Sequence, residues 1–330
     1  MAELIRQVRP AWVQLQQLPP LPPHALRNAL LALGTGLLVM AGLASLSTFW
    51  APTRAWWDAA EHGSAMAAGV QASLLAAVAT AVGALPVFLV QRVSKLQEAA
   101  LLSFSAGVML AAAIFALLLP SLDAGQALFG GRTGAAALSG AGLALGMGLM
   151  LAVDRFTPHE HAVLPPAAPG HAASAHTPGA VQSAKLMVLA ILIHNVPEGL
   201  AVGAAYAGPQ DAAGAQAGAS VALAIGLQNM PEGLIVAMAL RTLGRSAAQA
   251  WGVAALTGLA EPLGAILGLA VLGSLPAFYP LGLALAAGAM LFVVSHEIIP
   301  ETHRNGFETL ATGTLLAGFV FMLLLDAALN

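Results

Sequence analysis

Long apolar runs separated by short polar stretches make up most of the chain. Nine of these runs approach the roughly 20 residues that a helix needs to cross the hydrocarbon core of a membrane. They cover about 27–49, 66–90, 100–120, 134–153, 185–207, 215–240, 249–273, 280–298 and 309–328. The pattern predicts an all-α polytopic membrane protein whose two termini lie on opposite sides of the membrane.

The positively charged residues agree with this register of spans. Short cytoplasmic loops are enriched in Lys and Arg, and a cytoplasmic N-terminus places ten of the twelve basic residues on that side. These ten are Arg6, Arg9, Arg27, Arg92, Lys95, Arg155, Lys185, Arg241, Arg245 and Arg304, and only Arg54 and Arg132 are left outside. We therefore predict a cytoplasmic N-terminus and a C-terminus on the outer side.

The composition narrows the class of protein further. Charged residues are 8% of the 330 residues and hydrophobic residues are 58%, whereas about 25% charged residues are usual in soluble domains. Too few charges are present to cover a water-facing surface, which excludes a soluble globular enzyme. The chain has no cysteine, so disulfides are excluded and any metal must be held by nitrogen and oxygen donors.

One polar linker, at 154–183, interrupts the spans. It carries prolines, small residues and four histidines, which are His159, His161, His171 and His176. This composition predicts a mobile cytoplasmic loop. Composition leaves two interpretations of the histidines equally open, namely weak metal binding and a solvated spacer.

Two successive spans carry the same polar motif, HNVPEGL at 194–200 and QNMPEGL at 228–234. The outer polar pair of each motif is spaced i, i+4, which places both side chains on one face of a helix. These pairs are His194 with Glu198 and Gln228 with Glu232. The proline inside each motif removes one helical hydrogen bond and frees a backbone carbonyl. Each motif is therefore predicted to form a two-pronged clamp.

The acids of these spans lack a partner of opposite charge. Glu198, Glu232 and Glu261 lie in the middle of their spans, and no Lys or Arg lies at a comparable position. Such acids must be protonated, hydrated or paired with a bound cation. Carboxylates, one imidazole, amides and freed carbonyls suit a divalent ion such as Zn, Mn, Fe(II) or Cd, and there are enough donors for two adjacent ions. The structural alternative is that the polar helices only hydrogen-bond one another; the cost of unpaired buried acids favours the metal site.

Further polar residues lie near the two ends of the predicted path. Asp123 and Asp326 form a candidate entrance on the outer side. The candidate exit consists of the four loop histidines with His296, Glu297, Glu301 and His303. For each of these residues, a solvated charge at the end of a helix is the plain alternative.

At these motifs the chain resembles the ZIP (Zrt-/Irt-like protein) family of metal transporters, and in particular its bacterial GufA-like branch. The resemblance covers about 64–328 and rests on HNVPEG followed by QNMPEG, on SAGVMLAAAIFALLLPS and on VVSHEIIPE. The family has eight core helices with both termini outside. The resemblance therefore implies an eight-helix ZIP-type transport domain over 64–330. The segment 1–63 would add a cytoplasmic stretch, one extra N-terminal transmembrane helix and an outer loop.

The resemblance also implies a function and a ligand set. A secondary transporter would move divalent metal into the cytoplasm by elevator-like sliding of the helices that bear the site, with zinc favoured over Cd, Fe(II) or Mn. One metal would be held by His194, Glu198, Gln228 and Glu232, and a second by Asn195, Asn229 and Glu261 with the bridging glutamates. Metal is then a transported substrate, and no cofactor is expected.

This chain departs from some relatives at two positions. Some carry an acid where Asn229 stands, which implies a weaker or modulatory second site here. Others carry a polar residue at Ala116, which implies a more apolar pore lining in this chain.

The expected setting is the inner membrane of a bacterium, with the lipid bilayer and divalent metal ions as partners and no nucleic acid. A homodimer is one of the assemblies left open.

Two other functions stay open at this point. An intramembrane metallohydrolase would use zinc-bound water, but the motif is HNxxE and lacks the second histidine of HExxH. A proton or sodium exchanger could use the buried acids alone, although an imidazole beside two glutamates is more than a monovalent ion needs. No Walker A motif supports an ATP-driven pump, and we expect a transporter rather than an enzyme.

Overall fold

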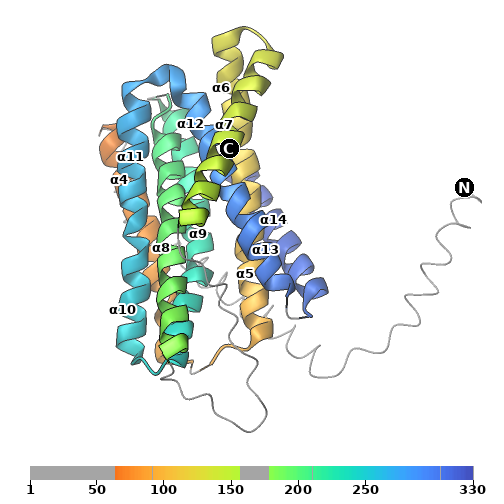
Figure 1. Cartoon of the computed structure of the whole chain (residues 1–330). Helices are drawn as coiled ribbons and strands as arrows, with labels where there is room; N and C mark the ends of the chain where they lie inside the picture. The colour runs from red at the N-terminus through yellow and green to blue at the C-terminus, as the bar shows by residue number, and fades with distance from the viewer. Residues whose placement is uncertain (1–63, 91, 157–177, 210, 305, 330) are drawn as a thin grey trace, which may run out of the picture. The chain divides into compact units, whose positions relative to one another are not determined.

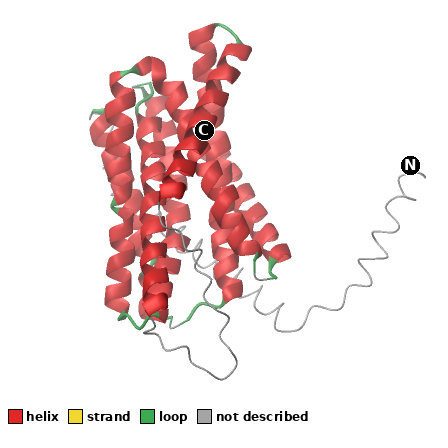
Figure 2. Ribbon diagram, in the orientation of Figure 1, coloured by secondary structure: helices red, strands yellow, loops and turns green. Residues whose placement is uncertain are grey.

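The computed structural model describes residues 64–90, 92–156, 178–209, 211–304 and 306–329 (Figure 1). Within these ranges every regular element is helical (Figure 2). The expected extra span at 27–49, the rest of segment 1–63 and the four loop histidines lie outside the described residues.

The helical elements follow one another along the chain with short connections. They are α4 (Ala65–Gly83), η1 (Leu85–Phe88), α5 (Lys95–Ala111), η2 (Ala112–Leu118), α6 (Leu119–Phe129), α7 (Arg132–Phe156), α8 (Pro178–Tyr206), α9 (Ala212–Thr242), α10 (Ala247–Gly258), α11 (Ala260–Ser274), η3 (Pro276–Phe278), α12 (Tyr279–Val293), η4 (Val294–Ile298), α13 (Ile299–His303) and α14 (Glu308–Leu329). Of the short elements, η1 and η3 are 3₁₀ turns, and η2 and η4 are π-helical.

Seven stretches of the described residues are long and apolar enough to cross a membrane. They are Ala65–Phe88, Lys95–Phe129, Arg132–Arg155, Ala213–Thr242, Ala247–Gly273, Tyr279–His303 and Glu308–Ala328. Each overlaps one of the expected spans, and the 29-residue α8 covers the expected span at 185–207. The prediction of an all-α polytopic membrane protein is confirmed.

Short polar motifs fix where several of these helices begin. Ser94 caps α5 and Ser246 caps α10, each in a capping box with a glutamine three residues later. The side chain of Asp211 accepts a hydrogen bond from the backbone of Gly214 and caps α9. Such caps satisfy backbone N–H groups that the first turn of a helix leaves unpaired.

Prolines shape the spans in different ways. Pro197 and Pro231 lie inside continuous helices, whereas Pro262 lies just after the break between α10 and α11. A proline at 262 cannot donate to the carbonyl of Gly258, the last residue of α10. The expected span at 249–273 is therefore two helices, and the break places Glu261 in the first turn of α11.

The described helices form two groups in space. The clamp group consists of α4, η1, α8, α9, α10 and α11, with α8 packed along α11 and α4 along α9. The flanking group consists of α5, η2, α6, α7, α12, η4, α13 and α14, with α5 packed along α14 and α7 along α12 (Figure 1). Both repeated motifs lie in the clamp group, on α8 and α9.

Inside each group the helices approach at backbone distance. A Cβ atom added at Gly199 of α8 would overlap the backbone of Glu261 on α11, and one added at Gly107 of α5 would overlap the backbone of Leu315 on α14. Small residues permit this close packing in membrane helices. Between the groups, in contrast, Leu272 of α11 contacts α12 at Gly282 through its side chain.

The pairing of helices repeats along the chain. The α4–α9 pair corresponds to the α11–α8 pair, and the α5–α14 pair corresponds to α12–α7. In both halves a π-helical segment, η2 or η4, precedes a proline, Pro120 or Pro300. Internal repeats of this kind are typical of secondary transporters, whose substrate sites lie where the repeats meet.

Candidate metal centre

The two repeated motifs face each other across α8 and α9. Gln228 donates a hydrogen bond from Nε2 to Oε1 of Glu198 over 2.9 Å. Glu198 is 1% exposed and Gln228 is fully buried. The two i, i+4 pairs predicted from the sequence therefore meet in the interior, where Glu198 of the first pair contacts Gln228 of the second.

A second set of contacts joins the asparagines of the motifs to the broken span. Asn229 donates from Nδ2 to Oε1 of Glu261 over 2.8 Å, and the Thr80 hydroxyl lies 3.5 Å from the same oxygen. Asn195 donates from Nδ2 to the carbonyl of Thr257 near the end of α10, over 2.8 Å. One motif therefore bonds to the end of α10 through Asn195, and the other bonds through Asn229 to Glu261 in the first turn of α11.

The remaining two prongs contact the flanking group. His194 Nε2 lies 2.9 Å from Oε1 of Glu297 on η4. The Ser105 hydroxyl on α5 donates toward Oε1 of Glu232 over 3.0 Å and toward the carbonyl of Gln228 over 3.1 Å. Each of the seven predicted ligand residues therefore makes a hydrogen bond, but the bonds form separate sets.

The three acids lie close to one another. If all were ionised, Glu198 would repel both Glu232 and Glu261, and Glu261 would also repel Glu232. In the part of the chain that the structure describes, these three acids form no ion pair with Lys or Arg. Buried like charges are costly unless a cation or protons neutralise them.

Four buried oxygen atoms of the predicted ligand residues have no hydrogen-bond partner. They are Glu198 Oε2, Gln228 Oε1, Asn229 Oδ1 and Glu261 Oε2. A buried polar atom without a partner costs about 1 to 3 kcal/mol, and four on three adjacent helices are unusual. Carboxylate and amide oxygens are acceptors that a divalent cation could satisfy together.

The ligands are not yet gathered around one point. Across the described ranges, no three His, Asp or Glu side chains converge in the geometry of a metal site. The amide nitrogens of Gln228 and Asn229 instead lie against the acids. Turning each amide about its last bond would exchange nitrogen for oxygen in nearly the same place. A metal could then replace the N–H donors and use the amide oxygens as ligands.

Known proteins resemble the chain over much or all of its length. A family model described as the ZIP zinc transporter matches residues 157–326. Zinc transporter GufA of Myxococcus xanthus is 45% identical over 266 residues, which cover 80% of this chain and 100% of the relative. Zinc transporter ZIPB of Bordetella bronchiseptica is 41% identical over 329 residues, which cover 100% of this chain and 99% of the relative. The chain belongs to the ZIP family.

Other matches extend the comparison to animals. Zinc transporter ZIP11 of Homo sapiens is 44% identical over 147 residues, which cover 44% of this chain and 43% of the relative. The ZIP membership confirms the resemblance drawn from the motifs. Because the match to ZIPB spans the whole chain, the segment 1–63 also has a counterpart in that ZIP protein.

The residues predicted for the exit of this ZIP protein are scattered. Glu297 contacts the clamp through His194, whereas His296 lies 3.8 Å from Asp154 and stacks on Phe292. Glu301 pairs with Arg304 at 3.4 Å, and His303 bonds to the Ile299 carbonyl and to Thr312. Of these four predicted exit residues, Glu297 alone reaches the clamp.

The two predicted entrance residues lie on helices of the flanking group. Asp123 is exposed on α6, and Asp326 lies near the end of α14. Their role as an entrance stays a prediction.

Two residues at the clamp and one beside a predicted exit residue were missed by sequence reasoning. Ser105 and Thr80 bond to the clamp acids, and Asp154 lies 3.8 Å from His296. A lone hydroxyl in an apolar run is a weak signal, because its position along a helix does not say which helix it faces. Asp154 stands at the start of the linker, where a solvated charge is the ordinary expectation.

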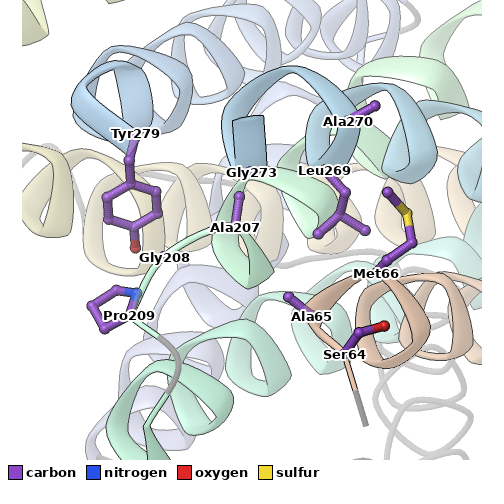
Figure 3. A pocket seen from close by; sticks show the side chains of 10 residues that line it. All are labelled: Ser64, Ala65, Met66, Ala207, Gly208, Pro209, Leu269, Ala270, Gly273 and Tyr279. Atoms are coloured by element: carbon purple, nitrogen blue, oxygen red, sulfur yellow. The ribbon is translucent and has the colours of Figure 1, made fainter. Parts of the chain in front are cut away.

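A separate pocket of about 670 Å³ lies where α4, α8, α11 and α12 end or begin (Figure 3). Its lining has no charged side chain and consists of Ser64, Ala65, Met66, Ala207, Gly208, Pro209, Leu269, Ala270, Gly273 and Tyr279. The ring of Tyr279 stands against Gly208 across this pocket (Figure 3). Without carboxylates or imidazoles, the pocket does not fit a metal ion.

Proposed function

We propose that this ZIP protein is a secondary transporter of zinc whose path runs through the clamp of α8, α9 and α11. The relatives GufA and ZIPB are named zinc transporters. The observation that carries the proposal is the set of four unpartnered buried oxygens among three acids that would repel one another when ionised. Bound dications would offset the negative charge of the acids and could give those oxygens a partner.

The donor set supports two adjacent ions. His194, Glu198, Gln228 and Glu232 would hold the first ion, and Asn195, Asn229 and Glu261 the second, with Glu232 or Glu198 able to bridge. The nearness of Glu198, Glu232 and Glu261, which would repel one another when ionised, supports two adjacent sites. Because Asn229 is neutral, the second site would bind more weakly than one with a third acid at that position.

Import by elevator-like movement is the mechanism that the packing favours. Glycine contacts lock α8 to α11 in one group and α5 to α14 in the other, so each group is suited to move as a unit. Ion release toward the cytoplasm would pass Glu297, which already contacts His194. We assign residues 64–330 to this transport domain and residues 1–63 to an added segment, in a bacterial inner membrane with the N-terminus inside.

Zinc uptake by proteoliposomes tests the proposal. Vesicles loaded with a fluorescent zinc indicator should show saturable uptake under an inward zinc gradient with the wild-type protein. Glu232→Ala and Glu198→Ala should abolish it, whereas Glu308→Ala, which removes an exposed acid at the start of α14, should not. Normal uptake by a folded Glu232→Ala protein would remove the clamp from the path, and proton or sodium flux without zinc uptake would favour an exchanger.

A further inference from the structure

Among the described residues, Ser105 and Glu297 of the flanking group make side-chain hydrogen bonds to predicted metal ligands of the clamp group. Ser105 of α5 bonds to Glu232 of α9, and Glu297 of η4 bonds to His194 of α8. The anchors belong to the flanking group, and the residues they hold belong to the clamp group. These two contacts between the groups therefore use side chains that would take the ion.

At His194 the two uses exclude each other. Its Nε2 atom lies 2.9 Å from Oε1 of Glu297. In this bond Nε2 either carries a proton that it donates to a carboxylate or uses its lone pair to accept one from a protonated Glu297. Zinc takes the lone pair of an unprotonated ring nitrogen. While the bond to Glu297 exists, Nε2 of His194 cannot ligate zinc.

At Glu232, the Ser105 hydroxyl and zinc compete for the same carboxylate oxygen. The single hydroxyl proton of Ser105 is directed at Oε1 of Glu232 and at the Gln228 carbonyl. A carboxylate oxygen that binds zinc lies about 2.0 to 2.2 Å from the ion. It moves toward the metal and offers less charge to the hydroxyl, so metal binding weakens the bond to Ser105.

We propose that Ser105 and Glu297 hold the empty clamp group against the flanking group, and that zinc releases this hold by taking the atoms that make it. The inference rests on the proposed function, because it assigns a regulation to the same site. Coupling between two binding events is reciprocal. If zinc weakens the hold, then the hold weakens zinc binding by the same factor.

Zinc affinity of the full-length protein in detergent gives the first test, by competition with a fluorescent zinc indicator. Ser105→Ala should bind zinc about tenfold more tightly than the wild type, the size expected for loss of one competing hydrogen bond to a charged group. Ser121→Ala is the matched control, since it removes another fully buried hydroxyl of the same span, bonded to the Pro280 carbonyl. Its affinity should equal that of the wild type.

The direction in which zinc affinity changes distinguishes this proposal from a simpler role for Ser105. If Ser105 only orients Glu232 toward the metal, Ser105→Ala should bind zinc more weakly. Weaker or unchanged affinity in a folded Ser105→Ala protein would overturn the proposal.

Movement between the groups gives the second test, because the chain has no cysteine of its own. Leu272 of the clamp group is 7% exposed and contacts Gly282 of the flanking group. The reactivity of a thiol introduced by Leu272→Cys therefore reports on how closely the two groups pack. In the wild-type background, zinc should speed its reaction with maleimide. With Ser105→Ala added, the zinc-free protein should react faster than the zinc-free protein with the wild-type Ser105, since only the Glu297 contact then remains.

Two controls make this reading specific. Val236→Cys places a thiol in a buried cluster formed mainly by η1, α9 and α10, against which Val188 and Ile191 of α8 pack, and zinc should not change the rate there. Leu272→Cys combined with Glu232→Ala removes a predicted zinc ligand. Any change in maleimide rate that zinc still causes in this variant would come from zinc binding the thiol itself. A zinc-free rate that Ser105→Ala leaves at the wild-type value would contradict the hold.

Failure of the hold is distinguishable from failure of the proposed function. If wild-type proteoliposomes take up no zinc, the transport proposal fails by itself. If the wild type transports zinc through the clamp but Ser105→Ala raises neither the zinc affinity nor the maleimide rate of the zinc-free Leu272→Cys protein, only the proposed role of Ser105 and Glu297 is wrong.

Discussion

Replacement of Gly199 by alanine should damage the metal centre from outside its ligand set. Gly199 directly follows Glu198 and packs against the backbone of Glu261. An added Cβ atom would lie 2.6 Å from the carbonyl carbon and 2.7 Å from the Cα atom of Glu261, whereas ordinary contact begins at 3.4 Å. The two helices must therefore separate by at least about 0.8 Å, which far exceeds the ±0.2 Å that metal–ligand distances tolerate.

The energetic size follows from the cost of overpacking. Such substitutions cost about 1 to 3 kcal/mol, which is equivalent to roughly 5- to 150-fold in zinc affinity if binding must restore the original spacing. Competition with a fluorescent indicator measures the affinity, and thermal loss of the helical circular dichroism signal measures the stability. Both should fall in Gly199→Ala.

The matched control is a glycine of the same helix group that has room. A Cβ atom at Gly252 of α10 would meet nothing within 4 Å, so Gly252→Ala should keep wild-type affinity and should not lower stability, since alanine favours the helix. Wild-type affinity and stability in Gly199→Ala would refute the claim that close α8–α11 packing sets the ligand spacing.

Three further predictions concern the acids, one helix contact and zinc itself. Asn229→Asp should lower the melting temperature of the zinc-free protein by several degrees, because it replaces the donor to Glu261 by a like charge, and zinc should restore it; unchanged melting without zinc would contradict this. Trp251→Phe should cost about 1 kcal/mol by losing the bond from Nε1 to the Ala81 carbonyl, with zinc uptake unchanged, and reduced uptake at equal protein level would link this contact to transport. Zinc at about 100 times its Kd should stabilise the wild type by about 2.7 kcal/mol, and a similar shift in Glu232→Ala would place the stabilising ion elsewhere.

Much of the fold follows from the sequence because each span is a local property. An apolar run of the right length must form a helix in a membrane, since only internal hydrogen bonding satisfies its backbone there. The span at 249–273 was less predictable. Whether Pro262 bends the span or divides it depends on how its neighbours satisfy the freed carbonyls, and here Asn195 bonds to one nearby, that of Thr257.

The clamp was predictable for a different reason. Acids in mid-span stand out against an apolar background, and the repeated motif fixes the helix face on which Glu198 and Glu232 lie. The partners of the clamp were not predictable, because Ser105 and Thr80 reach it only through the packing of other helices. A contact between distant segments has no signature in one sequence.

Anomalous X-ray scattering at the zinc absorption edge, from crystals of the zinc-loaded wild-type protein, would show where zinc binds. We expect anomalous density between α8, α9 and α11, with Glu198, Gln228 and Glu232 oxygens about 2.0 to 2.2 Å from the ion. His194 should have turned away from Glu297 to join it. Zinc density confined to the protein surface, with the clamp empty and the Gln228–Glu198 hydrogen bond intact, would contradict the account.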